Sequence, residues 1–89
     1  MLFNSLLNSE RGFYAMYVFR SSTGTFTIGV DITVPSGYEL CVGGMWLGSY
    51  ETPGKAAEAV CLRCTGWLDW DRGDGEQAPG SLEEWETLE

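Results

Sequence analysis

The chain has 89 residues with 13 acidic and 5 basic side chains and no histidine, so its formal net charge at pH 7 is −8. This length allows one small domain, residues 1–89, with a thin core and little room for a deep active site. Because the chain has no histidine to act as a general base, we expect no enzyme and no cofactor. Apolar residues make up 44% of the chain, which is too much for an intrinsically disordered protein.

Nothing in the sequence points to a membrane or to an oxidising compartment. No apolar run approaches the roughly 18 residues of a membrane span, and residues 1–8 lack the basic start and the long apolar stretch of a signal peptide. Three cysteines are an odd number and too few for a disulfide scaffold. The sequence therefore predicts a cytoplasmic protein without a membrane partner.

The first half of the chain predicts an antiparallel sheet. Residues 1–12 place apolar side chains at helical spacing, which favours a short helical turn or an apolar arm. Residues 13–20 are aromatic and β-branched, as in a strand with few solvent contacts. Residues 25–34 alternate apolar with polar side chains, as in a strand with one wet face. Two further strands are predicted at 38–43 and 45–50.

The Gly43-Gly44 pair predicts the two-residue turn of a hairpin, because glycine tolerates the positive φ angles that this turn needs. The register that follows makes three cross-strand pairs: Val42 with Met45, Cys41 with Trp46, and Leu40 with Leu47. The pair that contains the cysteine then lies on the opposite face of the sheet from the other two.

A helix is predicted at 53–64, where the sequence marks both ends. Thr52 is a suitable N-cap, Pro53 suits the first helical position, and Gly66 suits a left-handed residue after the C-terminus. Small apolar side chains fall on one face of this helix: Ala56, Ala57, Val60, Cys61 and Cys64. We expect this face to pack closely on the sheet.

The two cysteines of the helix are interpreted as small core residues, although the spacing Cys61-x-x-Cys64 also occurs in redox and zinc sites. A redox pair needs its reactive thiol at a helix N-terminus, and this pair lies in the last turn, where the helix dipole raises a thiol pKa. A zinc site needs four ligands, and only Cys41 is left to join these two. No metal is therefore expected, and a metal or redox role is the alternative.

Residues 67–89 form an acidic segment that also contains three of the four tryptophans. Its last 21 residues, 69–89, hold eight acidic side chains and one arginine, a net charge of −7. We expect the rings of Trp67, Trp70 and Trp85 to pack on the body of the protein and to hold the carboxylates outward. The alternative is that one or two rings stay exposed as anchors for a partner.

This segment supplies the candidate partner-binding surface, which consists of Asp69, Trp70, Asp71, Asp74, Glu76 and Trp85. A fixed array of carboxylates selects a basic protein surface and repels nucleic-acid phosphates. Neutralising Asp71, Asp74 and Glu76 is expected to change stability by no more than about 0.5 kcal/mol, as for ordinary surface positions. A calcium loop does not fit, because counting from Asp69 puts Gly73 at the fifth position, where a ligand is needed.

The second half of the chain resembles a group of small uncharacterised bacterial proteins. The shared pattern reads LGSY, TP, AA, V, TGW, WD, P, L and EWE from Leu47 to Glu86, and both order and spacing match. The resemblance implies a compact α+β domain and no particular activity. Residues 46–60 are also similar to the plant ethylene-response type of DNA-binding domain, whose sheet reads DNA with arginine and tryptophan; here the predicted strands offer only Arg20 and Trp46.

These features predict an α+β fold: a three- to four-stranded antiparallel sheet, one helix packed across one face, and a packed acidic C-terminal tail. Residues 1–12, 13–66 and 67–89 are the expected arm, sheet with helix, and tail. The expected function is that of a small non-catalytic bacterial protein that binds or regulates a partner with a basic surface through its acidic surface. The alternative is a nucleic-acid-binding module built on the sheet, which the net charge of −8 disfavours.

Overall fold

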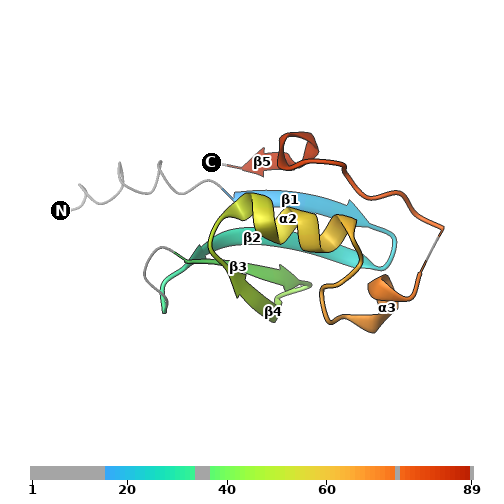
Figure 1. Ribbon diagram of the computed structural model, residues 1–89, viewed down its shortest axis with the longest axis horizontal. Coiled ribbons are helices and arrows are strands. Elements are labelled where there is room, and N and C mark those ends of the chain that lie inside the picture. Colours follow the sequence, from blue (N-terminus) through green and yellow to red (C-terminus); the bar gives the residue numbers. More distant parts are fainter. Residues whose placement is uncertain (1–15, 34–36, 74, 89) are drawn as a thin grey trace.

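Five antiparallel strands form one sheet in the computed structural model, which describes residues 16–33, 37–73 and 75–88 (Figure 1). The order across the sheet is β4-β3-β2-β1-β5. The strands are β1 (Met16–Ser21), β2 (Gly24–Asp31), β3 (Gly37–Val42), β4 (Met45–Tyr50) and β5 (Glu86–Leu88). The α+β class with an antiparallel sheet is confirmed, but the strand number is five and not three to four. The predicted arm at 1–12 lies outside the described residues.

The strand that was not predicted from the sequence is β5, at the end of the acidic tail. It pairs with β1 over three residues, with Val18 opposite Glu86 and Met16 opposite Leu88. The Glu86 carboxylate also forms an ion pair with Arg20 on β1. The tail therefore belongs to the sheet. Its pairing with β1 covers backbone N–H and C=O groups that an unpaired edge would expose.

The hairpin of β3 and β4 has the predicted turn, with φ of 57° at Gly43 and 86° at Gly44. Two predicted pairs are confirmed, Val42 with Met45 and Cys41 with Trp46. The third is wrong: Leu40 lies opposite Gly48, because a β-bulge shifts the register by one residue between Leu40 and Cys41. The bulge leaves Leu47 as the extra residue, and its side chain packs against the core.

The main helix, α2 (Pro53–Cys61), begins as predicted and ends earlier than residue 64. The Thr52 hydroxyl accepts a hydrogen bond from the N–H of Lys55 at 3.1 Å, and proline occupies the first turn. The helix ends because Arg63, with a φ of 57°, turns the chain into the left-handed region.

The interpretation of the helix cysteines as core residues is wrong, since both Cys61 and Cys64 are exposed. The buried stripe of α2 consists of Ala56, Ala57, Ala59 and Val60. Cys61 is the last residue of α2 and lies about 40° past Ala57 around the helix, just outside this stripe. Cys64 follows the left-handed turn and is no longer helical.

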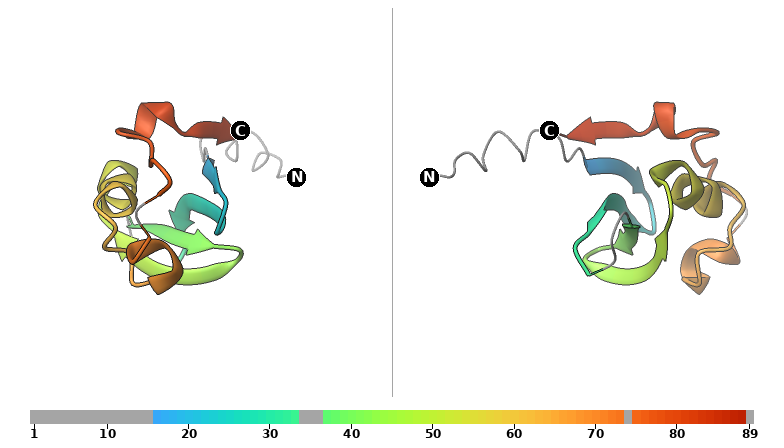
Figure 2. Two further views of the ribbon diagram at one scale, coloured as in Figure 1. Left: turned by 90° about the vertical axis from the view of Figure 1, so that its right-hand side faces the viewer. Right: turned by 60° about the vertical axis from the view of Figure 1, so that its left-hand side comes forward.

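The core lies between one face of the sheet and a cover made of α2 and the tail, with α2 and α3 (Leu68–Asp71) on the same side of the sheet (Figure 2). Its buried side chains are Phe26, Ile28, Leu40, Val42, Ala56, Ala57, Val60, Trp70 and Trp85. The last two show that the tail packs on the body, as predicted. None of the described helices is long and apolar enough to cross a membrane.

Candidate functional site

The two tryptophans of the predicted partner surface are core residues. Trp70 is 1% exposed and Trp85 is 4% exposed. The Trp70 ring packs edge-on against Phe19 and Phe26 at centroid distances of 5.6 and 5.4 Å, and its indole N–H donates to the carbonyl of Val60 at 2.9 Å. The indole N–H of Trp85 has no partner among the described residues. Neither ring is available to a docking partner, so these two members of the predicted surface are corrected.

The carboxylate of Asp71, at the end of α3, faces the chain and not the solvent. One oxygen accepts hydrogen bonds from the Thr65 N–H at 3.0 Å and the Thr65 hydroxyl at 2.8 Å. The other accepts from the N–H of Gly66 at 2.7 Å. These bonds close the turn between α2 and α3, because they satisfy the backbone donors of two residues that lie in neither helix. Asp71 is therefore a structural residue.

Glu76 is also turned inward, toward the β1–β2 turn. Its carboxylate accepts from the Ser22 N–H at 2.9 Å and the Ser22 hydroxyl at 2.7 Å. These bonds hold the pKa of Glu76 below its ordinary value of 4.5. The Arg63 guanidinium lowers this pKa by a smaller amount, whereas burial raises it. The same guanidinium donates to the carbonyl of Glu76 and to that of Trp70. Glu76 therefore fastens the tail to the sheet.

The predicted outward array of carboxylates is reduced by these contacts. Asp69 is exposed, and Asp74 lies outside the described residues. Nearby in the tail, Glu84 accepts from the N–H of Gly80 at 3.1 Å and Glu86 is paired with Arg20. Four of the six acidic side chains that the structure describes in the tail thus contribute hydrogen bonds to the fold, which the charge pattern alone does not reveal.

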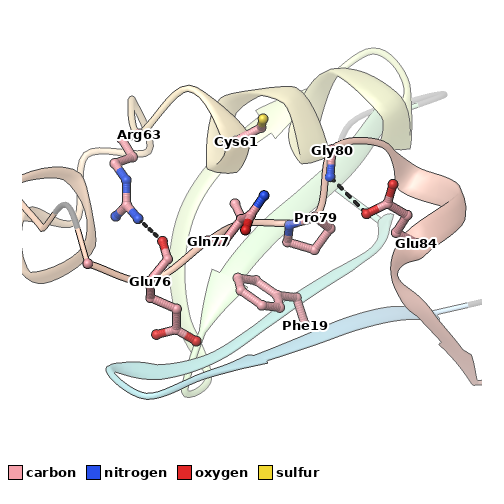
Figure 3. A pocket seen from close by; sticks show the side chains of 10 residues that line it. Phe19, Cys61, Arg63, Glu76, Gln77, Pro79, Gly80 and Glu84 are labelled. Carbon is pink, nitrogen blue, oxygen red and sulfur yellow. Dashed lines mark hydrogen bonds between the residues drawn. The ribbon is translucent and has the colours of Figure 1, made fainter.

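An open pocket of about 970 Å³ lies beside the tail, between β1, the end of α2 and residues 75–80 (Figure 3). Phe19 and Pro79 contribute apolar surface, and both carboxylates that line it, Glu76 and Glu84, are bonded to neighbouring segments. Among the described residues that line it, the pocket therefore presents no free pair of acid and base groups. No three His, Cys, Asp or Glu side chains of the described residues are grouped so as to hold a metal ion.

The exposed aromatic side chain of the sheet is Trp46, on β4. Trp46 is 58% exposed, and its neighbour Met45 is 49% exposed. Trp46 lies opposite Cys41, so its ring is on the face of the sheet that α2 does not cover. The predicted pairing of Trp46 with Cys41 already placed the ring on this face. The solvent exposure of the Trp46 ring is what the sequence alone did not show.

Two acidic side chains, Glu39 and Asp31, belong to this same face of the sheet. Glu39 lies opposite Ser49 on β4, and the Ser49 hydroxyl donates to the carboxylate of Asp31. The Thr33 N–H and hydroxyl donate to the same carboxylate at 2.9 and 2.6 Å. These hydrogen bonds lower the pKa of Asp31, and the bond from the Ser49 hydroxyl is the largest cause. Asp31 is 4% exposed and stays charged at neutral pH.

Positive charge is absent from this part of the chain. Residues 21–54 contain no lysine and no arginine, whereas they contain three acidic residues. Arg20, the last cation before them, is paired with Glu86. Trp46 therefore stands in a negative region without a competing cation from its own half of the sheet.

Comparison of the chain with models of protein families, with curated proteins and with solved structures finds no match.

Proposed function

We propose that this protein is a small non-catalytic binding module that selects a partner with a basic surface through its acidic surface. The observation that carries the proposal is the exposure of Trp46, 58%, in a region of the sheet that holds carboxylates and no cation. Tryptophan is enriched among the residues that dominate binding energy at protein interfaces. Placed on a sheet, it loses little conformational freedom when a partner binds.

The surface of this proposal differs in its residues from the one that the charge pattern predicted. It consists of Trp46 on β4 and Glu39 on β3, which lie on the face opposite α2, together with Glu51, which lies directly after β4 and is exposed. Asp69 is the one exposed carboxylate of the earlier set among the described residues. The basic preference of the partner rests on the net charge of −8, which attracts cationic surfaces and accelerates their association.

A nucleic-acid partner is the alternative. Such a module neutralises phosphates with lysine and arginine on the face that meets the nucleic acid. The face opposite α2 carries the Glu39 side chain and the buried carboxylate of Asp31, and its arginine, Arg20, is already paired with Glu86. The charge of this face therefore favours a basic protein over a nucleic acid.

The proposal is tested with two labelled ten-residue peptides, one alternating arginine with threonine and one alternating glutamate with threonine. The wild type should bind the arginine peptide, with an affinity that decreases as salt is added, and should not bind the glutamate peptide. Trp46→Ala should weaken binding at least tenfold. Leu68→Ala is the matched control, because Leu68 is also exposed, 54%, but lies on α3.

Two outcomes would contradict the proposal. One is equal binding of the two peptides, or no binding of either. The other is an equal effect of the two alanine substitutions, which would mean that Trp46 is not part of the binding surface. A duplex DNA of comparable length, bound with salt-dependent affinity where the arginine peptide is not, would support the alternative.

A further inference from the structure

We infer that β4 accepts a short basic segment of the partner as an added strand, so that the partner extends the sheet beyond its open edge. This inference rests on the proposed function and states how the partner is held. In strand addition, main-chain hydrogen bonds supply affinity and alternate side chains supply specificity. Three features of the described residues support this mode of binding.

The first feature is the position of β4 in the sheet. β4 is the last strand on its side of the order β4-β3-β2-β1-β5, so within the described part of the chain it pairs on one side alone. Alternate residues of such a strand point their N–H and C=O groups away from the sheet. Those groups are the template that an additional strand needs.

The second feature is the composition of this edge. Open edges are commonly protected by charged side chains, by proline or by a β-bulge. The strand Met45–Tyr50 reads MWLGSY and contains neither a charge nor a proline. It does contain the bulge, between Trp46 and Gly48, so the regular part of the edge is the three-residue stretch from Gly48 to Tyr50.

Three residues suffice for pairing in this fold, because the other edge strand shows it. β5 is three residues long and pairs with β1 over those three residues. A partner segment that pairs with Gly48–Tyr50 and continues past the bulge places a side chain near the Trp46 ring. An arginine or lysine at that position is attracted by the face of the indole ring.

The third feature is the charge beside the edge. Glu39 and Asp31 lie on the Trp46 face, and Glu51 follows β4 directly. The negative charge of Glu39 and Asp31 also acts on Cys41 in β3. Burial raises the pKa of the Cys41 thiol, and these two carboxylates raise it further. Cys41 is the cross-strand partner of Trp46. A cationic side chain over Trp46 therefore enters a negative field.

A second copy of this chain is a poorer occupant of the edge. Pairing β4 with β4 of another molecule would bring together two copies of Glu51, which follows β4, and of Glu39 on the neighbouring strand, with no cation in residues 21–54. Each copy also has a net charge of −8, and like charges placed opposite one another oppose association. The charge of the edge therefore selects a basic segment.

The experiment compares the arginine–threonine peptide with two N-methylated versions, one methylated on the arginine amides and the other on the threonine amides. In an added strand, all residues with side chains on one face direct their N–H groups to the same side. One methylated version should therefore lose binding at least tenfold, and the other should bind within about twofold of the parent peptide, since only one set of N–H groups meets β4.

Amide hydrogen exchange gives a second, independent measurement on the unmodified peptide. Exchange should slow in residues 45–50 when the peptide is added, and it should not slow in residues 86–88, which form the other edge of the sheet. Trp46→Ala should reduce the slowing at residues 48–50, since the ring anchors the added strand.

The outcomes separate this inference from the proposed function. If the parent peptide binds in a manner that depends on Trp46 and both methylated versions bind equally well, strand addition is wrong and the binding function stands. If the parent peptide does not bind, the proposed function fails and the inference fails with it. Self-association of the free protein that Trp46→Ala abolishes would overturn the inference in favour of a second copy at β4.

Discussion

Asp71 and Thr65 are joined by two hydrogen bonds to one carboxylate oxygen, 3.0 Å from the Thr65 backbone nitrogen and 2.8 Å from its hydroxyl. The second oxygen of Asp71 holds the N–H of Gly66, whose φ is 92°. An aspartate from a strongly acidic segment thus fixes the turn that carries Trp70 into the core. This arrangement gives a structural role to the TGW and WD parts of the sequence pattern.

Asp71→Asn is expected to destabilise the protein by about 2 kcal/mol, which replaces the surface-position value of about 0.5 kcal/mol expected from the sequence. Hydrogen bonds to a charged acceptor are stronger than neutral ones, and the amide nitrogen of asparagine cannot accept from Gly66. Asp69→Asn is the matched control on the same short helix and should change stability by less than about 0.5 kcal/mol, since Asp69 is exposed. Urea unfolding of the three proteins measures both values. Equal stability of the two variants would show that the Asp71 bonds are not important to the fold.

Stability should fall in acid, because the pKa values of Asp31 and Glu76 are lowered in the folded protein from 3.8 and 4.5. A carboxylate with a lowered folded-state pKa contributes stability that is complete above its unfolded pKa and is lost as the pH falls through the folded pKa. The melting temperature should therefore be level between about pH 8 and pH 6 and should decrease below about pH 4.5.

Ser49→Ala removes the largest cause of the Asp31 shift. The variant should have a lower melting temperature than the wild type at neutral pH. The difference should narrow as the pH falls below the ordinary pKa of 3.8, toward the lowered pKa at which folded Asp31 takes up its proton. Ser81→Ala is the control, because the Ser81 side chain makes no capping hydrogen bond. A constant difference between Ser49→Ala and wild type from neutral pH to pH 3 would contradict the assignment.

The tryptophans should differ sharply in their contribution to stability. Trp70→Ala is expected to cost about 3–5 kcal/mol or to abolish cooperative unfolding, because the ring is fully buried and its N–H is bonded to Val60. Trp46→Ala should stay within about 1 kcal/mol of the wild type, because that ring is largely in solvent. Denaturant unfolding measures both, and similar losses in the two variants would mean that Trp46 is packed in solution.

Thiol reactivity should divide the three cysteines. Cys61 and Cys64 are exposed and should react with an aromatic disulfide reagent in a fast phase of two equivalents. Cys41 is partly covered and its pKa is raised, so less thiolate is present and its reaction should be slow. Cys41→Ser should remove the slow phase, and each of the other serine substitutions should remove one fast equivalent. Three equivalents reacting at one rate would contradict this division.

The features that could be predicted from the sequence are those set by local patterns. Alternation located β2, the Gly43-Gly44 pair located the turn of the hairpin, and Thr52 with Pro53 located the start of α2. Packing of the tail followed from the large apolar area of its tryptophan rings. These signals depend on neighbours in the sequence, and they need no knowledge of the tertiary structure.

The features that were missed depend on contacts between distant segments. β5 is the exposed tripeptide Glu-Thr-Leu, which has no strand pattern of its own and forms because the edge of β1 is open to it. The bulge near Leu47 depends on how β4 fits β3. The inward carboxylates of Asp71 and Glu76 could not be told from solvated ones, because their partners, Thr65 and Ser22, are set by the fold.

The pairing of β1 with β5 has a consequence for the synthesis of this protein. Arg20 and Glu86, which join these strands, are 66 positions apart in the chain. At ordinary rates of translation the ribosome needs roughly 3–13 s to add that many residues. During this interval the nascent β1 has no β5 beside it, and any extended segment nearby can compete for that position. Mispairing of β1 is therefore possible for as long as β5 has not been made.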